Sequence, residues 1–182
     1  VGPLTLLGLN SAIETAPLLA AGQLGQHQIE VAGELLERLG GQGAIRVVLI
    51  HHPPLPGLAS PRRALTDAAQ FARMLERCGA EVVLYGHNHR ERLDWIAHAA
   101  RRSGTGFIPV VGAPSASAGR VHHDEPLARY NLFTFFSGPR GLRIRHVVRG
   151  LDAPDGKVVK LSETTLEADT GAAAAAETVR RP

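Results

Sequence analysis

Two segments decide how this chain is interpreted, VVLIHHPP at Val47–Pro54 and VVLYGHNH at Val82–His89. Each is a short apolar run, rich in β-branched residues, that stops abruptly at polar, proline or glycine positions. Such runs are typical of buried strands. The two segments therefore predict strands over Arg46–Ile50 and Glu81–Tyr85, with histidines placed directly after both.

Helical patterns lie between the predicted strands. Apolar residues recur at helical spacing over Gln26–Leu39 and again over Ala68–Leu75. Thr66 is a suitable N-cap for the second helix, and Asp67 would lie near its positive end. With the apolar run Leu4–Leu9 in front, the order is strand, helix, strand, helix, strand. This order predicts an α/β fold with a parallel sheet and helices packed against it.

The second half of the chain changes character, because its strands follow one another without helices. Strands are predicted over Phe107–Val111, Arg129–Phe136 and Leu142–Val148, the last two as an antiparallel hairpin. Residues 151–182 contain an alanine run and few large apolar side chains, which predicts a disordered, low-complexity tail. We therefore divide the chain into a domain over residues 1–150 and a tail over 151–182.

Composition excludes several classes of protein. The 182 residues are 44% hydrophobic and 20% charged, as in soluble globular proteins, and the net charge is only +3. The basic residues are scattered, which argues against a nucleic-acid partner. No apolar run approaches the roughly 20 residues of a membrane span. The single cysteine, Cys78, excludes a disulfide framework and fits a reducing, cytoplasmic compartment.

Three histidines carry the functional interpretation. His51 follows one predicted strand, and His87 and His89 follow the next. Ligands gather where the carboxyl ends of parallel strands meet solvent, and residues two apart in an extended segment face the same side. A single histidine at a strand end is usually a polar loop residue. Three at adjacent strand ends instead predict a site for a transition metal, which neutral imidazole binds well.

These two segments resemble the last two metal motifs of the calcineurin-like metallophosphoesterases. The HHPP form and the later PSASA at Pro114–Ala118 resemble the bacterial branch that includes class III cyclic-nucleotide phosphodiesterases. The resemblance covers Leu4 to about Gly150. It implies a four-layer α/β/β/α sandwich and two divalent metal ions, of Mn, Fe, Zn or Co, bridged by a hydroxide that attacks phosphorus. The implied substrate is a small-molecule phosphate ester, and no membrane partner is expected.

The resemblance also assigns roles to single residues. It makes His51 and His87 ligands of one metal and His89 a ligand of the other. His52 is not a ligand by this alignment; shaping the turn before the two prolines is favoured over lining the substrate side. Arg90 could bind a phosphate, although a solvated surface arginine is the simpler interpretation.

The sequence departs from the family in its upstream motifs. The D-x-H, G-D and G-N-H motifs, which supply the bridging Asp, further ligands and the histidine that assists the leaving group, do not occur. The expectation is that the chain is the C-terminal part of the domain, that its N-terminal half lies upstream of Val1, and that the chain alone is inactive. The alternative is a non-catalytic metal-binding or interaction module. A monoester, a pyrophosphate or a nucleic acid remains open as the substrate.

A second histidine cluster is less informative. His122 and His123 precede Asp124 and Glu125 in a loop bounded by glycine and proline. No predicted strand orients them, so a solvated loop is favoured over a metal site.

Overall fold

The computed structural model describes residues 4–98, 106–121, 125–138 and 141–167, and these form a mixed α/β fold. The predicted fold class is confirmed. The elements in chain order are β1 (Leu4–Gly8), α1 (Gln26–Gly41), β2 (Ile45–Ile50), α2 (Ala68–Cys78), β3 (Val82–Tyr85), β4 (Arg92–His98), β5 (Gly106–Gly112), β6 (Arg129–Gly138), β7 (Gly141–Leu151) and β8 (Val158–Glu167).

The larger sheet has the strand order β1-β2-β3-β5-β4. Strands β1, β2, β3 and β5 are parallel, as the alternation of strands and helices predicts, and β4 runs antiparallel to β5. In this order β1 is an edge strand, and Leu4 and Leu6 on it are 54% and 61% exposed. The sequence interpretation missed β4, because Arg92–His98 carries charged and aromatic residues at an exposed edge and no continuous apolar run.

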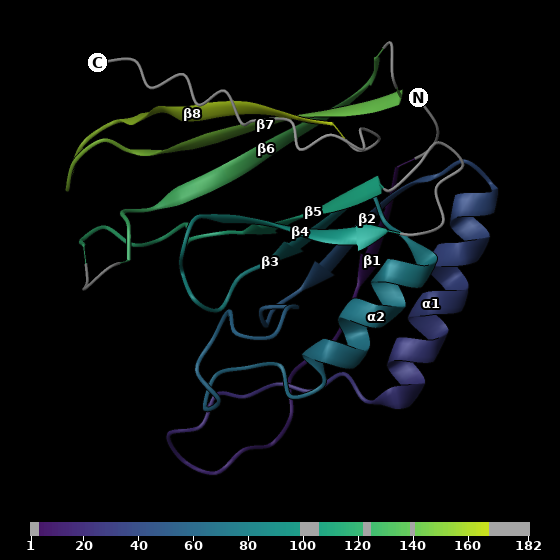
Figure 1. Cartoon of the computed structure of the whole chain (residues 1–182). Helices are drawn as coiled ribbons and strands as arrows, with labels where there is room; N and C mark the ends of the chain where they lie inside the picture. The colour runs from purple at the N-terminus through teal and green to yellow at the C-terminus, as the bar shows by residue number, and fades with distance from the viewer. Residues whose placement is uncertain (1–3, 99–105, 122–124, 139–140, 168–182) are drawn as a thin grey trace.

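Three layers are visible in Figure 1, with the larger sheet between the helices and the smaller sheet. On one face, Phe71 and Leu75 of α2 and Leu36 of α1 pack against Val48 and Val83 of the sheet. On the other face, the strands contribute to a second core cluster that joins the two sheets: Val47, Val82, Val111, Ile144 and Leu166. The described residues thus form three of the four layers that the resemblance implies. Neither of the two described helices is long and apolar enough to cross a membrane.

The smaller sheet corrects the interpretation of the tail. Its order is β6-β7-β8, and the predicted β6–β7 hairpin is confirmed. Residues Val158–Glu167, expected to be disordered, form β8 and pair antiparallel with β7, and Leu166 is 2% exposed. A strand with one solvated face needs few large apolar residues, so low apolar content was a poor guide here. Residues 168–182 of the expected tail lie outside the described residues.

The cap of α2 also differs from the prediction. The helix begins at Ala68, and the Thr66 hydroxyl donates instead to the carbonyl of Gly22 over 3.1 Å. The Asp67 carboxylate accepts the backbone N–H groups of Leu24 and Gly25 over 3.0 and 2.8 Å. Both residues therefore fix the segment that leads into α1, and the predicted cap is wrong because these long-range contacts compete with the local one.

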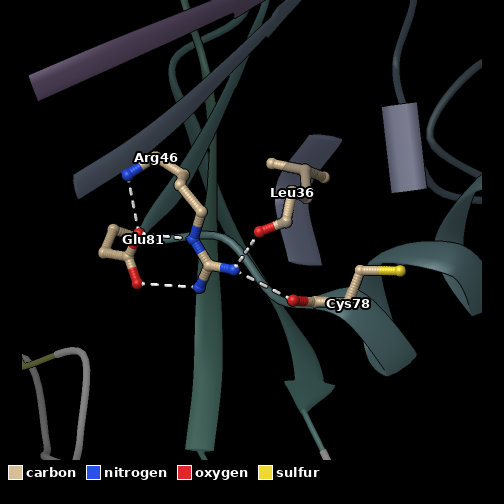
Figure 2. A network of polar contacts seen from close by, with 4 residues as sticks. All are labelled: Leu36, Arg46, Cys78 and Glu81. Atoms are coloured by element: carbon tan, nitrogen blue, oxygen red, sulfur yellow. Dashed lines mark hydrogen bonds and ion pairs between the residues drawn. The ribbon is translucent and has the colours of Figure 1, made fainter. Parts of the chain in front are cut away.

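A buried ion pair links the amino ends of β2 and β3. Arg46 and Glu81 are 7% and 9% exposed and make a two-pronged contact, from Nε to Oε2 and from Nη2 to Oε1, each over 3.0 Å. The Arg46 backbone N–H donates to the same carboxylate, and Nη1 donates to the carbonyls of Leu36 and Cys78 (Figure 2). This network ties both helices to both strands.

Candidate metal centre

The carboxyl ends of β2 and β3 bring His51 and His87 together. The strands are parallel neighbours with Ile50 opposite Tyr85, so the residues after them emerge side by side. The Gly86 N–H donates to the His51 carbonyl over 3.1 Å and continues the pairing by one step. His51, His87 and His89 all line one cavity of about 810 Å³ at this edge of the sheet.

The turn that carries His87 and His89 has an unusual backbone. Their φ angles are 67° and 50°, in the left-handed region that residues with a side chain rarely adopt. Such conformations persist only where the surroundings enforce them, and they are common at binding and catalytic sites. Here both residues of the turn line the cavity.

The nitrogens of His51 and His87 have the spacing of two ligands of one ion. His87 Nδ1 and His51 Nε2 are 3.1 Å apart, and the ring centroids are 4.9 Å apart. Nitrogen ligands that bind at about 2.0–2.1 Å are separated by about 2.8–3.0 Å in octahedral and about 3.3–3.4 Å in tetrahedral geometry. Two neutral rings could also share one N–H between them. The separation therefore fits a metal ion without requiring one.

The protonation of His87 suits a ligand. Burial, and after it the neighbouring His52, His51 and Arg63, lower the pKa of His87 to about 4, although the carbonyl of Ala20 acts in the opposite direction. The ring is therefore neutral at pH 7, the form that binds metal ions. Its Nε2 is buried and has no hydrogen-bond partner among the described residues. This nitrogen is not the one that faces His51, so the proposed ligand pair does not depend on it.

His52 lies behind the cavity and is held from both sides. Its Nδ1 is 2.7 Å from Ser11 Oγ, its Nε2 is 3.2 Å from the Ala20 carbonyl, and it is 5% exposed. Burial also lowers the pKa of His52. Its ring contacts those of His51 and His87, with centroids 5.2 and 4.4 Å away. This geometry favours a role in shaping the turn and supporting the other two rings over contact with substrate.

His89 faces a partner that the sequence did not suggest. Its Nδ1 is 2.9 Å from Glu125 Oε2, and its side chain is 44% exposed. The two residues are 36 positions apart, and Glu125 belongs to no motif, so only the folded chain shows the contact. Within the described ranges, no three His, Cys, Asp or Glu side chains are gathered closely enough to hold a metal ion. The structure thus supplies one histidine pair with His89 on the same cavity.

Asn10 is a second residue that sequence reasoning left aside. It follows β1 as His51 follows β2, and it lines the same cavity. Its Oδ1 accepts the N–H of Ala12 over 3.0 Å, and its backbone is held by Gln28. No Asp or Glu is among the described residues that line this cavity.

The remaining candidates lie elsewhere. Arg90 lines a neighbouring cavity together with Arg63 and Arg92, and not the one that holds the histidines. His122, His123 and Asp124 lie outside the described residues, so their predicted loop stays a prediction.

Comparisons with known proteins assign no activity to this arrangement. No family model matches the chain, and no curated protein matches it. Among solved structures, the chain is similar to a single mutant of Vps29 from Entamoeba histolytica, with a TM-score of 0.33 and 12% sequence identity. That match covers 90% of this chain and 99% of the other. At this distance the similarity gives neither a family nor a function to this chain.

The geometry by itself sets what the site can do. Two imidazoles at ligand spacing can hold one divalent ion of Zn, Mn, Fe or Co. The cavity beside them is large enough for a small molecule. Without a lining carboxylate in the described residues, a second ion would need ligands from elsewhere.

Proposed function

We propose that this chain forms part of a metal-dependent phosphoric ester hydrolase. The observation that carries the proposal is the 3.1 Å separation of His51 Nε2 and His87 Nδ1 at the carboxyl ends of two neighbouring parallel strands. When bound, the metal would lower the pKa of a water molecule and neutralise charge on phosphoryl oxygens. A two-metal centre of the implied type remains part of this proposal.

Residues of this chain would bind the metal ion and orient the rings that hold it. His51 and His87 would hold one ion, while His52, fixed by Ser11 and Ala20, would keep both rings in place from behind. His89 would contribute to a second ion or bind substrate, with its ring oriented by Glu125 over 2.9 Å. Carboxylates that orient a ligating histidine in this way raise its basicity.

A metal-binding module without hydrolytic activity is the second candidate. The observation that favours it is that the described residues lining the histidine cavity include no carboxylate. Neutral imidazoles leave the charge of a cation pair uncompensated, and a bridging hydroxide requires two ions held close together. In both candidate functions His51 and His87 bind a metal ion, but only the hydrolase would turn over a phosphate ester.

Metal binding is tested first. Metal-free protein is titrated with Zn²⁺ and with Mn²⁺ by calorimetry, and the bound metal is counted by elemental analysis. We expect His51→Ala and His87→Ala to lower the affinity at least about 100-fold, since each removes a direct ligand. His27→Ala, at an exposed position at the start of α1, is the matched control and should leave affinity unchanged. Equal affinity in all four proteins would exclude this site.

Hydrolysis is tested next with a chromogenic phosphodiester in the presence of Mn²⁺. We expect negligible turnover from the 182-residue chain and measurable turnover when it is preceded by a segment carrying the D-x-H, G-D and G-N-H motifs. In the active protein, His87→Ala and His89→Ala should lower turnover and metal content together. Metal loading without turnover in both proteins would support the non-catalytic module instead.

A further inference from the structure

A second cavity, of about 580 Å³, opens beside the histidine cavity and is lined by three arginines. Arg63 comes from the segment before α2, Arg90 follows the G-H-N-H turn, and Arg92 begins β4. These residues come from three separate parts of the chain, so the fold brings their charges to one place. We refer to this cavity as the arginine pocket.

The walls of the arginine pocket are held by specific contacts. Asn88 Nδ2 donates to the Leu58 carbonyl over 2.7 Å and so ties the segment before α2 to the G-H-N-H turn. Asp94 holds the guanidinium of Arg92 through Nε and Nη2, over 2.6 and 2.9 Å. The turn that presents the histidines therefore also forms one wall of the pocket.

The charge inside the pocket is unbalanced. Its described lining residues include three arginines and one carboxylate, Glu125, whose Oε2 lies 2.9 Å from His89, and Asp94 pairs with one of these arginines, Arg92. Several positive groups around one hollow create a positive potential that favours an anion. Guanidinium groups suit the oxygens of phosphate and carboxylate because they donate two parallel hydrogen bonds. The volume is that of a small-molecule site.

The pocket and the histidine cavity adjoin each other. Tyr85 lines both, and Glu125 of the pocket contacts His89 of the cavity. We propose that the arginine pocket binds a second anionic group of the substrate, so that the substrate is a small phosphate ester carrying another phosphate. The link to hydrolysis rests on the proposed function, whereas anion binding by the pocket does not.

Metal-free protein isolates the pocket from the histidines. Protein passed over a chelating resin is titrated with pyrophosphate and with inorganic phosphate at fixed physiological salt. We expect pyrophosphate to bind more tightly, and Arg63→Gln and Arg90→Gln each to weaken it about tenfold, the effect of losing one charge-assisted hydrogen bond. Arg38→Gln on α1 is the control for the same change in net charge and should leave affinity unchanged. An equal loss of pyrophosphate affinity in Arg38→Gln would mean that the net charge of the protein, and not the pocket, determines binding, and would overturn the proposal.

The two proposals fail in different ways. His87→Ala should abolish metal binding and leave binding of pyrophosphate to metal-free protein intact. Pyrophosphate that binds only after metal loading, or that is insensitive to both Arg63→Gln and Arg90→Gln, would overturn the arginine pocket and leave the metal site standing. If pyrophosphate binding depends on both arginines but the protein takes up no metal, the metal site is overturned and the arginine pocket stands.

Discussion

The two ends of the β2–β3 strand pair differ in how completely their buried polar groups are hydrogen-bonded. At the amino end, the Arg46 guanidinium and the Glu81 carboxylate make contacts through all their nitrogens and oxygens. At the carboxyl end, just after both strands, His51 and His87 approach within 3.1 Å, and His87 Nε2 has no hydrogen-bond partner in the part of the chain that the structure describes. The same two strands carry both arrangements.

The difference separates a structural site from a functional one. Buried polar atoms in native proteins are almost always hydrogen-bonded, and those that are not need a specific reason. A complete network such as that of Arg46 stabilises a unique packing of helices on strands. Two imidazoles that face each other at ligand spacing beside an open cavity are instead suited to binding a metal ion. Substitutions at the two ends should therefore affect different measurements.

The largest effect on folding is expected at the amino end. Arg46→Met leaves the Glu81 carboxylate buried without its partner, and should lower the free energy of unfolding by about 3–5 kcal/mol. Urea denaturation measures the change. The double variant Arg46→Met/Glu81→Met, which removes both charges, should recover much of the loss. Arg145→Met, at an exposed ion pair on β7, should leave the urea midpoint nearly unchanged, and an equal shift there would contradict the contrast.

Substitution at the carboxyl end should change metal affinity more than stability. His87→Ala is expected to lower metal affinity at least about 100-fold, or about 2.7 kcal/mol, while changing the urea midpoint much less than Arg46→Met does. The reason is that the removed ring makes few hydrogen bonds in the folded state. A large loss of stability with unchanged metal affinity would make the histidines structural after all.

The support behind the histidines can be disturbed separately. A Cβ added at Gly22 would lie 2.3 Å from His52 Nδ1, so Gly22→Ala must displace the His52 ring. We expect a loss of about 1–3 kcal/mol in the free energy of unfolding, as for overpacked cores, together with weaker metal binding. Gly41→Ala, where an added Cβ meets nothing within 4 Å, is the matched control. Unchanged metal affinity in Gly22→Ala would remove His52 from the site.

The smallest effect is expected for a buried histidine with a partner. His146 on β7 stacks on Phe133 and bonds Asn131 over 2.9 Å, and burial lowers its pKa. The unfolded chain therefore binds a proton below about pH 6.5 that the folded chain resists. Stability should be constant above this pH and fall gradually as the pH decreases further.

The measurement is the urea midpoint of wild type and His146→Gln across this pH range. Loss of stability on acidification should be shallower in the variant, because it lacks the titrating ring. His52 and His87, whose pKa values are also lowered, contribute in the same direction, so some dependence should remain. An identical slope in both proteins would contradict the role of His146.

Much of the first sheet and the position of the histidines could be predicted from sequence. Strands β2 and β3 are largely continuous apolar runs, and such runs predict buried strands without knowledge of distant contacts. Strand β8 could not be predicted in this way, because it is stabilised by pairing with β7 and by one buried side chain, Leu166.

The two side-chain contacts that sequence analysis missed share one property, which is that their partners are distant in sequence. Glu125 meets His89 across 36 positions, and Glu81 meets Arg46 across 35. Local pattern contains no sign of either contact. Asn10 belongs to none of the motifs quoted from the sequence, although its place after β1 puts it on the same cavity.

The exposed edge of β1 has a practical consequence for handling the protein. Its outer backbone groups are not paired within the described sheet, and Leu4 and Leu6 present apolar side chains beside them. An open, apolar strand edge is a template for pairing with another chain and a recognised cause of aggregation. Concentrated samples should therefore self-associate through β1 before the core unfolds, and Leu6→Lys should raise the concentration at which the protein remains monodisperse.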